Sequence, residues 1–121
     1  MTELADPRTL SLLFADTHGF SKLTNFQIIQ YVKHVLPITA RVLGDHNPVA
    51  SNTWGDGLFV AFNEASAAAH CALELRDMFL DGEWDNKGLP NELSLRIALH
   101  IASVYVGDDP VRKDKHCSEL R

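Results

Sequence analysis

Two short apolar segments joined by a glycine-flanked tip constrain the fold of this chain more than any other feature. Residues 49–54 and 58–62 are rich in β-branched and aromatic side chains, and Gly55, Asp56 and Gly57 separate them. Two such segments with a short glycine-containing turn between them are typical of a β-hairpin. The sequence therefore predicts an antiparallel hairpin near the middle of the chain, and the other elements must be arranged around it.

The segments on both sides of the hairpin alternate between strand and helix patterns. An almost continuous apolar run at 10–16 predicts a strand buried on both faces. A capping box at 24–27 and apolar residues at helical spacing up to 43 predict a helix, which Pro37 would kink or break. A second helix is predicted over 65–80, capped by Asn63, and strands over 93–101 and 104–106. The order β-α-β-β-α-β predicts an α+β fold, the ferredoxin-like split βαβ sandwich.

Length, charge and targeting signals restrict the class of protein. The chain has 121 residues and a formal net charge of −5. This length predicts a single domain over 1–121, and the mixed charges of 108–121 predict a solvated tail. The acidic balance argues against a nucleic-acid partner, which would require a basic face. No signal-peptide pattern, membrane-length apolar run or disulfide framework is present, so we expect a cytoplasmic protein that does not bind membranes.

Two aspartates stand where these elements end. Asp16 ends the first predicted strand, and Asp56 lies at the tip of the hairpin. In a split βαβ sheet we expect the first strand to lie antiparallel beside the first hairpin strand, which brings both carboxylates to one rim. Hard oxygen ligands at such a rim suit Mg²⁺ or Mn²⁺. An aspartate at a strand end or turn is also commonly a turn former with no ligand, and spacing alone leaves both interpretations open.

The segment that follows Asp16 has the properties of a phosphate-binding loop. Thr17, His18, Gly19 and Phe20 lie between this carboxylate and the start of the predicted helix. Backbone amides in such a segment can receive phosphate oxygens, helped by the positive end of the helix dipole. Two carboxylates without a cation would repel a phosphate. The hypothesis therefore requires a metal ion on the carboxylates and a triphosphate that spans the metal and the amides.

The residues around these positions resemble the class III nucleotidyl cyclases, the adenylate and guanylate cyclase superfamily. The segment 14–21, Phe-Ala-Asp-Thr-His-Gly-Phe-Ser, resembles the first metal motif of that family. The segment 52–62 resembles the second, a Gly-Asp between two strands. The Leu-Arg-Ile-Ala-Leu-His segment at 95–100 and the Gly-Asp at 107–108 resemble a later strand and its turn. The matches occur in the family's order over roughly residues 8–110, and the resemblance implies a domain core over 8–107.

This resemblance implies a reaction and a set of ligands. In the family, two divalent cations, Mg²⁺ or Mn²⁺, bind the nucleoside triphosphate at each site. The enzyme releases pyrophosphate and forms a 3′,5′-cyclic nucleotide by two-metal catalysis. By resemblance, Asp16 and Asp56 are metal ligands, the Thr17 carbonyl is a further one, and Thr17, His18, Gly19 and Phe20 surround the phosphates. A homodimer is implied as well.

The position that reads the base departs from the family pattern. Asn52 stands three residues before Gly55, where adenylate cyclases have Lys and guanylate cyclases have Glu. An amide both donates and accepts hydrogen bonds, so it matches neither preference. Bacterial pyrimidine cyclases, which make cyclic UMP or cyclic CMP in antiphage signalling, are a branch with a different base pocket; cyclic AMP and cyclic GMP stay open. Trp54 stands where the family usually has an aliphatic residue. Its side chain either narrows the base pocket or only packs against its neighbours.

One part of the family's site has no counterpart in this sequence. Family members continue into a helix with an asparagine and an arginine that bind ribose and stabilise the transition state across the dimer interface. Nothing after Gly107 has that spacing, so the match is truncated at its C-terminal end. The alternative function is therefore a catalytically incomplete cyclase-homology module that binds nucleotide or a partner subunit. A receiver-like domain would need five alternating βα units, which the hairpin contradicts.

Overall fold

A computed structural model describes the backbone of residues 8–54, 56–108 and 115–119, and the side chains of 8–53 and 56–103. Within these described residues, nine elements follow one another. They are β1 (Arg8–His18), the short 3₁₀ helix η1 (Phe20–Lys22), α1 (Asn25–Asp45), β2 (Ala50–Trp54), β3 (Gly57–Phe62), α2 (Ala65–Leu80), the 3₁₀ helix η2 (Trp84–Lys87), β4 (Ser94–Asp108) and β5 (Lys115–Glu119).

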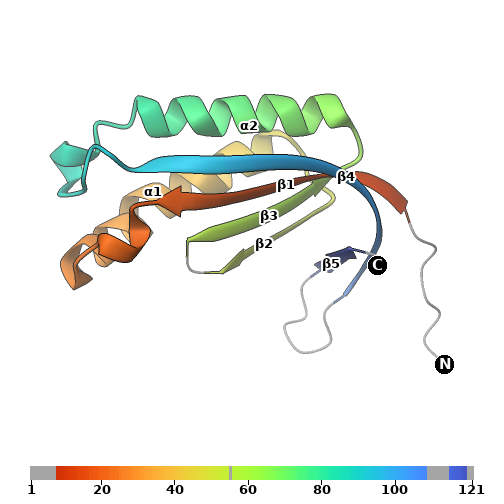
Figure 1. The fold of residues 1–121 in the computed structure, drawn as a ribbon, viewed down its shortest axis with the longest axis horizontal. Coiled ribbons are helices and arrows are strands. Elements are labelled where there is room, and N and C mark those ends of the chain that lie inside the picture. The colour runs from red at the N-terminus through yellow and green to blue at the C-terminus, as the bar shows by residue number, and fades with distance from the viewer. Residues whose placement is uncertain (1–7, 55, 109–114, 120–121) are drawn as a thin grey trace.

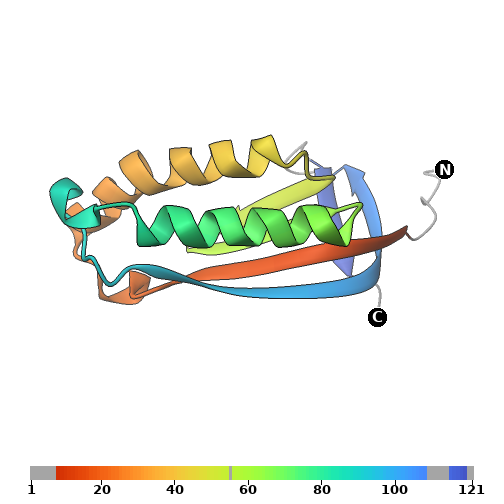
Figure 2. The same cartoon turned by 90° about the horizontal axis from the view of Figure 1, so that it is seen from above.

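The strands form one antiparallel sheet, and both long helices cover the same face of it. The strand order is β2-β3-β1-β4-β5, with β1 in the centre (Figure 1). Seen from above, α1 and α2 lie side by side across the sheet (Figure 2). The predicted α+β class and split βαβ arrangement are confirmed.

The neighbour of β1 differs from the prediction. β1 pairs with β3, the second strand of the hairpin, and not with β2, the first. The reason is the crossover: the connection through α1 places β2 parallel to β1 but leaves one strand position between them. When the hairpin turns back, β3 fills this gap. The turn of the hairpin still lies beside the end of β1, because Asp16 is paired with Gly57.

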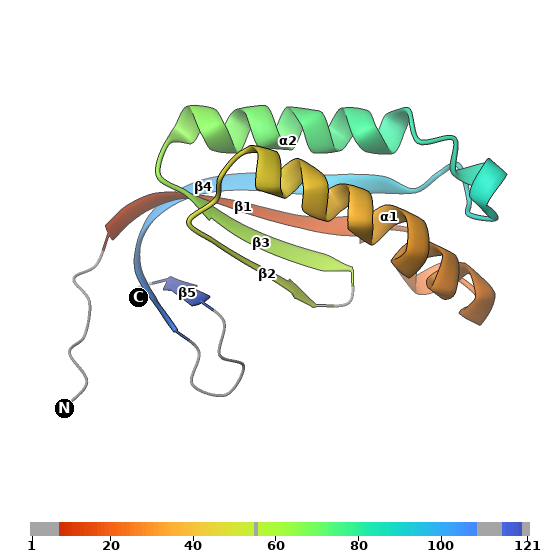
Figure 3. The ribbon, with the colours of Figure 1, turned by 180° about the vertical axis from the view of Figure 1, so that it is seen from behind.

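The central strand is buried on both faces, as its continuous apolar run predicts. Leu13 and Ala15 face the helices, in a cluster that includes Val60 and Leu75. Leu10, Leu12 and Phe14 face the other side, where they pack with Phe59 and Ala61. On that side β4 curves away from the helices, and β5, which pairs with it, comes close to β2 (Figure 3).

The helices follow the predictions with two exceptions. Thr24 forms the capping box, in which its hydroxyl accepts from the Gln27 amide at 3.2 Å and the Gln27 side chain accepts from the Thr24 amide at 3.0 Å. Pro37 does not break α1, which continues to Asp45 because apolar residues on both sides of Pro37 are packed in the core. The residue at the N-cap of α2 is Glu64; the side chain of Asn63 instead accepts a hydrogen bond from Arg8.

The C-terminal half contains more regular structure than the sequence pattern predicts. The two strands expected at 93–101 and 104–106 are one continuous strand, β4. Residues 115–119, within the segment expected to be a solvated tail, form β5. Strand pairing between β4 and β5 supplies the hydrogen bonds of this segment, and a pattern of mixed charges does not reveal such pairing.

Candidate functional site

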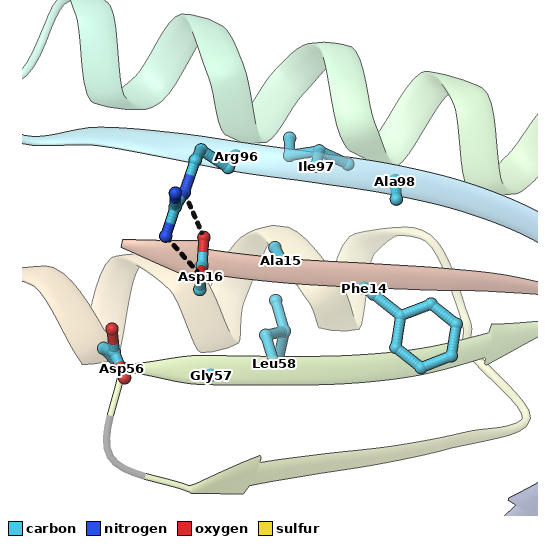
Figure 4. A pocket seen from close by; sticks show the side chains of 9 residues that line it. All are labelled: Phe14, Ala15, Asp16, Asp56, Gly57, Leu58, Arg96, Ile97 and Ala98. Carbon is cyan, nitrogen blue, oxygen red and sulfur yellow. Dashed lines mark hydrogen bonds and ion pairs between the residues drawn. The ribbon is translucent and has the colours of Figure 1, made fainter. Parts of the chain in front are cut away.

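The rim where β1 ends and the hairpin turns carries both predicted aspartates. Asp16 is paired with Gly57 across the β1–β3 ladder, and Asp56 directly precedes Gly57. The Thr17 N–H donates to the Asp56 carbonyl oxygen at 3.2 Å, which ties the hairpin tip to the end of β1. Both carboxylates border the same pocket, at neighbouring strand ends (Figure 4). Two residues forty positions apart in sequence are therefore brought together as expected.

A third charged side chain at this rim was not predicted. Arg96 on β4 is paired in register with Asp16 and forms a bidentate ion pair with it. Its Nε–H donates to Oδ1 at 2.9 Å, and an Nη2 hydrogen donates to Oδ2 at 2.8 Å. The hydrogen bond to Asp16, then the charge of Asp16 and more weakly that of Asp56, raise the pKa of the Arg96 guanidinium above its ordinary value. The site thus holds two carboxylates and one cation.

Asp16 and Arg96 lie on the sheet face opposite the helices, whereas Asp56, at the hairpin tip, borders a pocket on each side of the sheet. Residues paired across an antiparallel ladder point to the same face. Asp16, Gly57 and Arg96 form one cross-strand row, and Phe14, Phe59 and Ala98 form the next. A pocket of about 510 Å³ spans this area, within the range of ligand-binding clefts. Its rim is charged and its floor, which includes Phe14 and Ala98, is apolar (Figure 4).

The predicted base-reading position lies one row further along the same face. Asn52 on β2 is paired with Phe59, whose ring makes an edge contact with Phe14 at a centroid distance of 4.9 Å. Asn52 is only 8% exposed. The backbone of Trp54 ends β2, whereas its side chain lies outside the described residues. Asn52 is thus placed beside the aromatic floor, two residues along β2 from the row that contains Asp16.

The predicted phosphate loop divides between the pocket rim and the core. Thr17 is 2% exposed, and its side chain lies on the helix side, where its hydroxyl and that of Tyr31 are 2.6 Å apart. The ring of Phe20 packs edge-on against Tyr31 at 5.1 Å. His18 is exposed at the end of β1, and Gly19 has a left-handed φ of 90° that begins the turn of η1. Thr17 and Phe20 can therefore serve a ligand through their backbone and not through their side chains.

Tyr31 is a second residue that sequence reasoning missed. It lies on α1 and reaches across to the end of β1, so that its hydroxyl fixes Thr17 from behind the pocket. Burial, partly offset by the hydrogen bond with Thr17 and reinforced by the charge of Asp56, raises the pKa of the Tyr31 phenol. Its place in the helical pattern signals a core residue, and nothing in the sequence indicates its partner.

The donor set is compatible with a hard divalent cation. Among the described side chains, no group of three or more His, Cys, Asp or Glu residues could enclose a metal ion. Mg²⁺ is commonly bound by only one or two carboxylates, with the remaining positions filled by water and substrate phosphates. Asp16 and Asp56, next to an open pocket, supply that number of carboxylates. The residues present therefore fit a cation that is shared with a phosphate ligand.

The fold is found among nucleotide cyclases. The guanylyl cyclase Cya2 superimposes with a TM-score of 0.80 at 20% identity, covering 98% of this chain and 66% of that one. The adenylyl cyclase CyaB from P. aeruginosa gives 0.79 at 16% identity, with 99% and 68% covered. An adenylate/guanylate cyclase/hydrolase from Silicibacter pomeroyi gives 0.69 at 23% identity, with 92% and 64% covered. The chain matches no protein-family model, and it matches no curated protein.

These likenesses define the class of fold. The chain has the fold of class III adenylyl and guanylyl cyclase catalytic domains, and it spans about two thirds of the length of the first two of these structures. Sequence identities of 16–23% establish the architecture and leave the activity to be argued from the site. Within the part of the chain that the structure describes, neither helix combines the length and apolarity required to cross a membrane.

Proposed function

We propose that this chain is the metal-binding part of a nucleotidyl cyclase, which converts a nucleoside triphosphate to a 3′,5′-cyclic nucleotide and pyrophosphate. One observation carries the proposal: Asp16 and Asp56 converge on the rim of a pocket, in a fold shared with adenylyl and guanylyl cyclases. The open pocket face and the aromatic floor next to the carboxylates support a ligand with both an anionic and a planar part.

Each side chain of the rim has a role in this proposal. Asp16 and Asp56 hold Mg²⁺ or Mn²⁺, two per site, and the Thr17 carbonyl is a further ligand. When bound, these ions lower the pKa of the attacking ribose hydroxyl and neutralise charge on the departing pyrophosphate. The backbone of residues 17–20 receives phosphate oxygens. The Tyr31–Thr17 pair keeps this backbone in place from the helix side.

The base would lie over the aromatic floor. Phe14 offers apolar ring surface to the pocket and packs edge-on against the buried Phe59, and Asn52 is paired with Phe59 in the same row. An amide side chain can donate to a carbonyl oxygen and accept from an amino group, so the base is open. Cyclic UMP or cyclic CMP in antiphage signalling is one version of this proposal, and cyclic AMP or cyclic GMP is the other. Trp54 belongs to the same proposed nucleotide site.

The alternative function is a module that binds nucleotide or a partner subunit and does not turn it over. The observation that favours it is the absence of an asparagine–arginine pair with helical spacing in residues 108–121. A complete site would then require groups from outside these residues, and an identical copy of residues 108–121 lacks the pair as well. Both functions use the same carboxylates, so binding alone does not distinguish them.

A product assay separates the two. The chain is incubated with each of the four nucleoside triphosphates and Mn²⁺, and cyclic product is measured by mass spectrometry beside the Asp56→Asn variant. Cyclic product from the chain, lost in the variant, supports the cyclase. Nucleotide binding that depends on Mn²⁺ and Asp56 without product supports the alternative. Metal and nucleotide binding that is unaffected in both Asp16→Asn and Asp56→Asn would contradict the proposed site.

A further inference from the structure

The Arg96–Asp16 pair uses the same oxygen atoms that a metal ion at this rim would need. Both carboxylate oxygens of Asp16 accept a hydrogen bond from the guanidinium, one from Nε and one from Nη2. Among the described residues, Asp16 forms an ion pair at this rim and Asp56 does not. The guanidinium therefore acts as a cation already attached to one of the two carboxylates.

A divalent cation and this guanidinium repel each other on the same carboxylate. Mg²⁺ binds its ligand oxygens at about 2.1 Å. The Arg96 nitrogens stand 2.9 and 2.8 Å from the two oxygens of Asp16. A carboxylate has lone pairs for more than one partner. If both cations bound Asp16 at once, however, a dication and a monocation would be adjacent and would repel each other. One of the two has to leave.

Arg96 is the partner that can leave at small cost. Its side chain is 69% exposed and that of Asp16 is 43% exposed. Exposed ion pairs contribute little to stability, because water solvates both groups well when they separate. By contrast, the Thr17–Tyr31 pair behind the same strand end is buried, and separating it leaves buried hydroxyls without their partner. The exposed pair is exchangeable and the buried pair is fixed.

We propose that Arg96 competes with the divalent cation for Asp16. The guanidinium occupies the carboxylate when the metal is absent and is displaced when the metal binds. The proposal rests on the metal site of the proposed function and adds a residue that sets its affinity. Metal binding and the Arg96–Asp16 pair are then mutually exclusive states of this rim. Loss of the guanidinium should tighten metal binding, whereas loss of the Asp16 carboxylate should abolish it.

Binding of Mn²⁺ to the chain without nucleotide tests the affinity. Free Mn²⁺ is measured by electron paramagnetic resonance for wild type, Arg96→Gln, Asp16→Asn and Arg76→Gln. Arg76 is a matched control, because it forms an exposed ion pair with Asp77 on α2, outside the pocket. We expect Arg96→Gln to tighten Mn²⁺ binding about two- to fivefold, the range for an exposed ion pair. Arg76→Gln should equal wild type, and Asp16→Asn should bind no Mn²⁺ at this site.

A spectroscopic measurement tests displacement directly. The Arg96 Nε–H is observed by ¹⁵N NMR during titration with Mg²⁺, with the Arg76 Nε–H, which donates to Asp77 Oδ1 at 3.1 Å, as internal reference. We expect the Arg96 signal to shift and its exchange with water to accelerate, with a midpoint equal to that of metal binding. The Arg76 signal should stay unchanged.

The outcomes distinguish this inference from the proposed function. If Asp16→Asn loses Mn²⁺ but Arg96→Gln binds it equally or more weakly, the metal site stands and the competition is overturned. An Arg96 Nε–H signal that keeps its position at saturating Mg²⁺ would overturn it as well. If neither wild type nor Arg96→Gln binds Mn²⁺, both the metal site and the competition are wrong.

Discussion

Two consecutive residues at the end of β1 have opposite surroundings. Asp16 points to the open face of the sheet, where it is partly exposed and paired with Arg96. Thr17 points to the helix face, where its hydroxyl and that of Tyr31 form a buried pair. The alternation of side chains along a strand separates them. One strand end can therefore present an exchangeable charge to a ligand through one residue while the next residue anchors the backbone.

The largest effect should come from removing the carboxylate at the hairpin tip, beside Asp16 on the pocket rim. Asp56→Asn leaves one carboxylate at the rim, and a single exposed carboxylate does not hold Mg²⁺ or Mn²⁺ tightly. We expect Mn²⁺ affinity to fall by about 100-fold or more, because the negative charge that attracts the dication is halved. Isothermal titration calorimetry measures it. Unchanged affinity in a folded Asp56→Asn variant would show that the ion binds elsewhere.

On the buried face, loss of one hydroxyl should reduce stability. Tyr31→Phe leaves the Thr17 hydroxyl buried without its partner, which costs about 1–3 kcal/mol in the free energy of unfolding. Thr17→Val has a similar cost. The double variant should be less destabilised than the sum of the two, because both partners are then removed. Urea denaturation of the four proteins measures the coupling; additive losses would mean that the two hydroxyls do not interact.

The thiol of Cys71 tests whether the helix face excludes water. Burial, and to a lesser extent the charge of Glu74, raises the pKa of this thiol to about 11. The unfolded thiol ionises near 9.0, so stability from this group is complete below pH 9 and is lost as pH rises through about 11. In a Cys117→Ser background we expect alkylation of Cys71 at pH 8 to be slow and to accelerate towards pH 11. Rapid alkylation at pH 8 would show that the cluster opens readily.

The smallest effect on stability should come from the exposed pair. Arg96→Gln removes an ion pair that water replaces, so its melting temperature should change less than that of Tyr31→Phe. Differential scanning calorimetry of both variants under identical conditions makes the comparison. A larger loss in Arg96→Gln than in Tyr31→Phe would reverse the assignment of exchangeable and fixed pairs.

Much of this structure follows from local patterns. The hairpin, the capping box at Thr24 and the extent of α2 match the predictions, because each depends on neighbours in sequence. The neighbour of β1 was predicted wrongly, since it depends on how many strand positions the crossover from β1 to β2 spans. β5 was missed because its hydrogen bonds are made to a strand whose length the sequence does not show. The uninterrupted passage of α1 through Pro37 likewise depends on packing around it.

Local sequence patterns predict an aspartate at the end of a buried strand and another at a hairpin tip, and the resemblance to cyclases rests on these positions. Which other groups lie beside them depends on the tertiary fold. Arg96 reaches Asp16 across eighty positions because β1 and β4 pair in one particular register, and a shift of one residue would send it to the other face. Tyr31 meets Thr17 only because α1 packs over the end of β1. Register and packing depend on the whole core, so no local segment contains them.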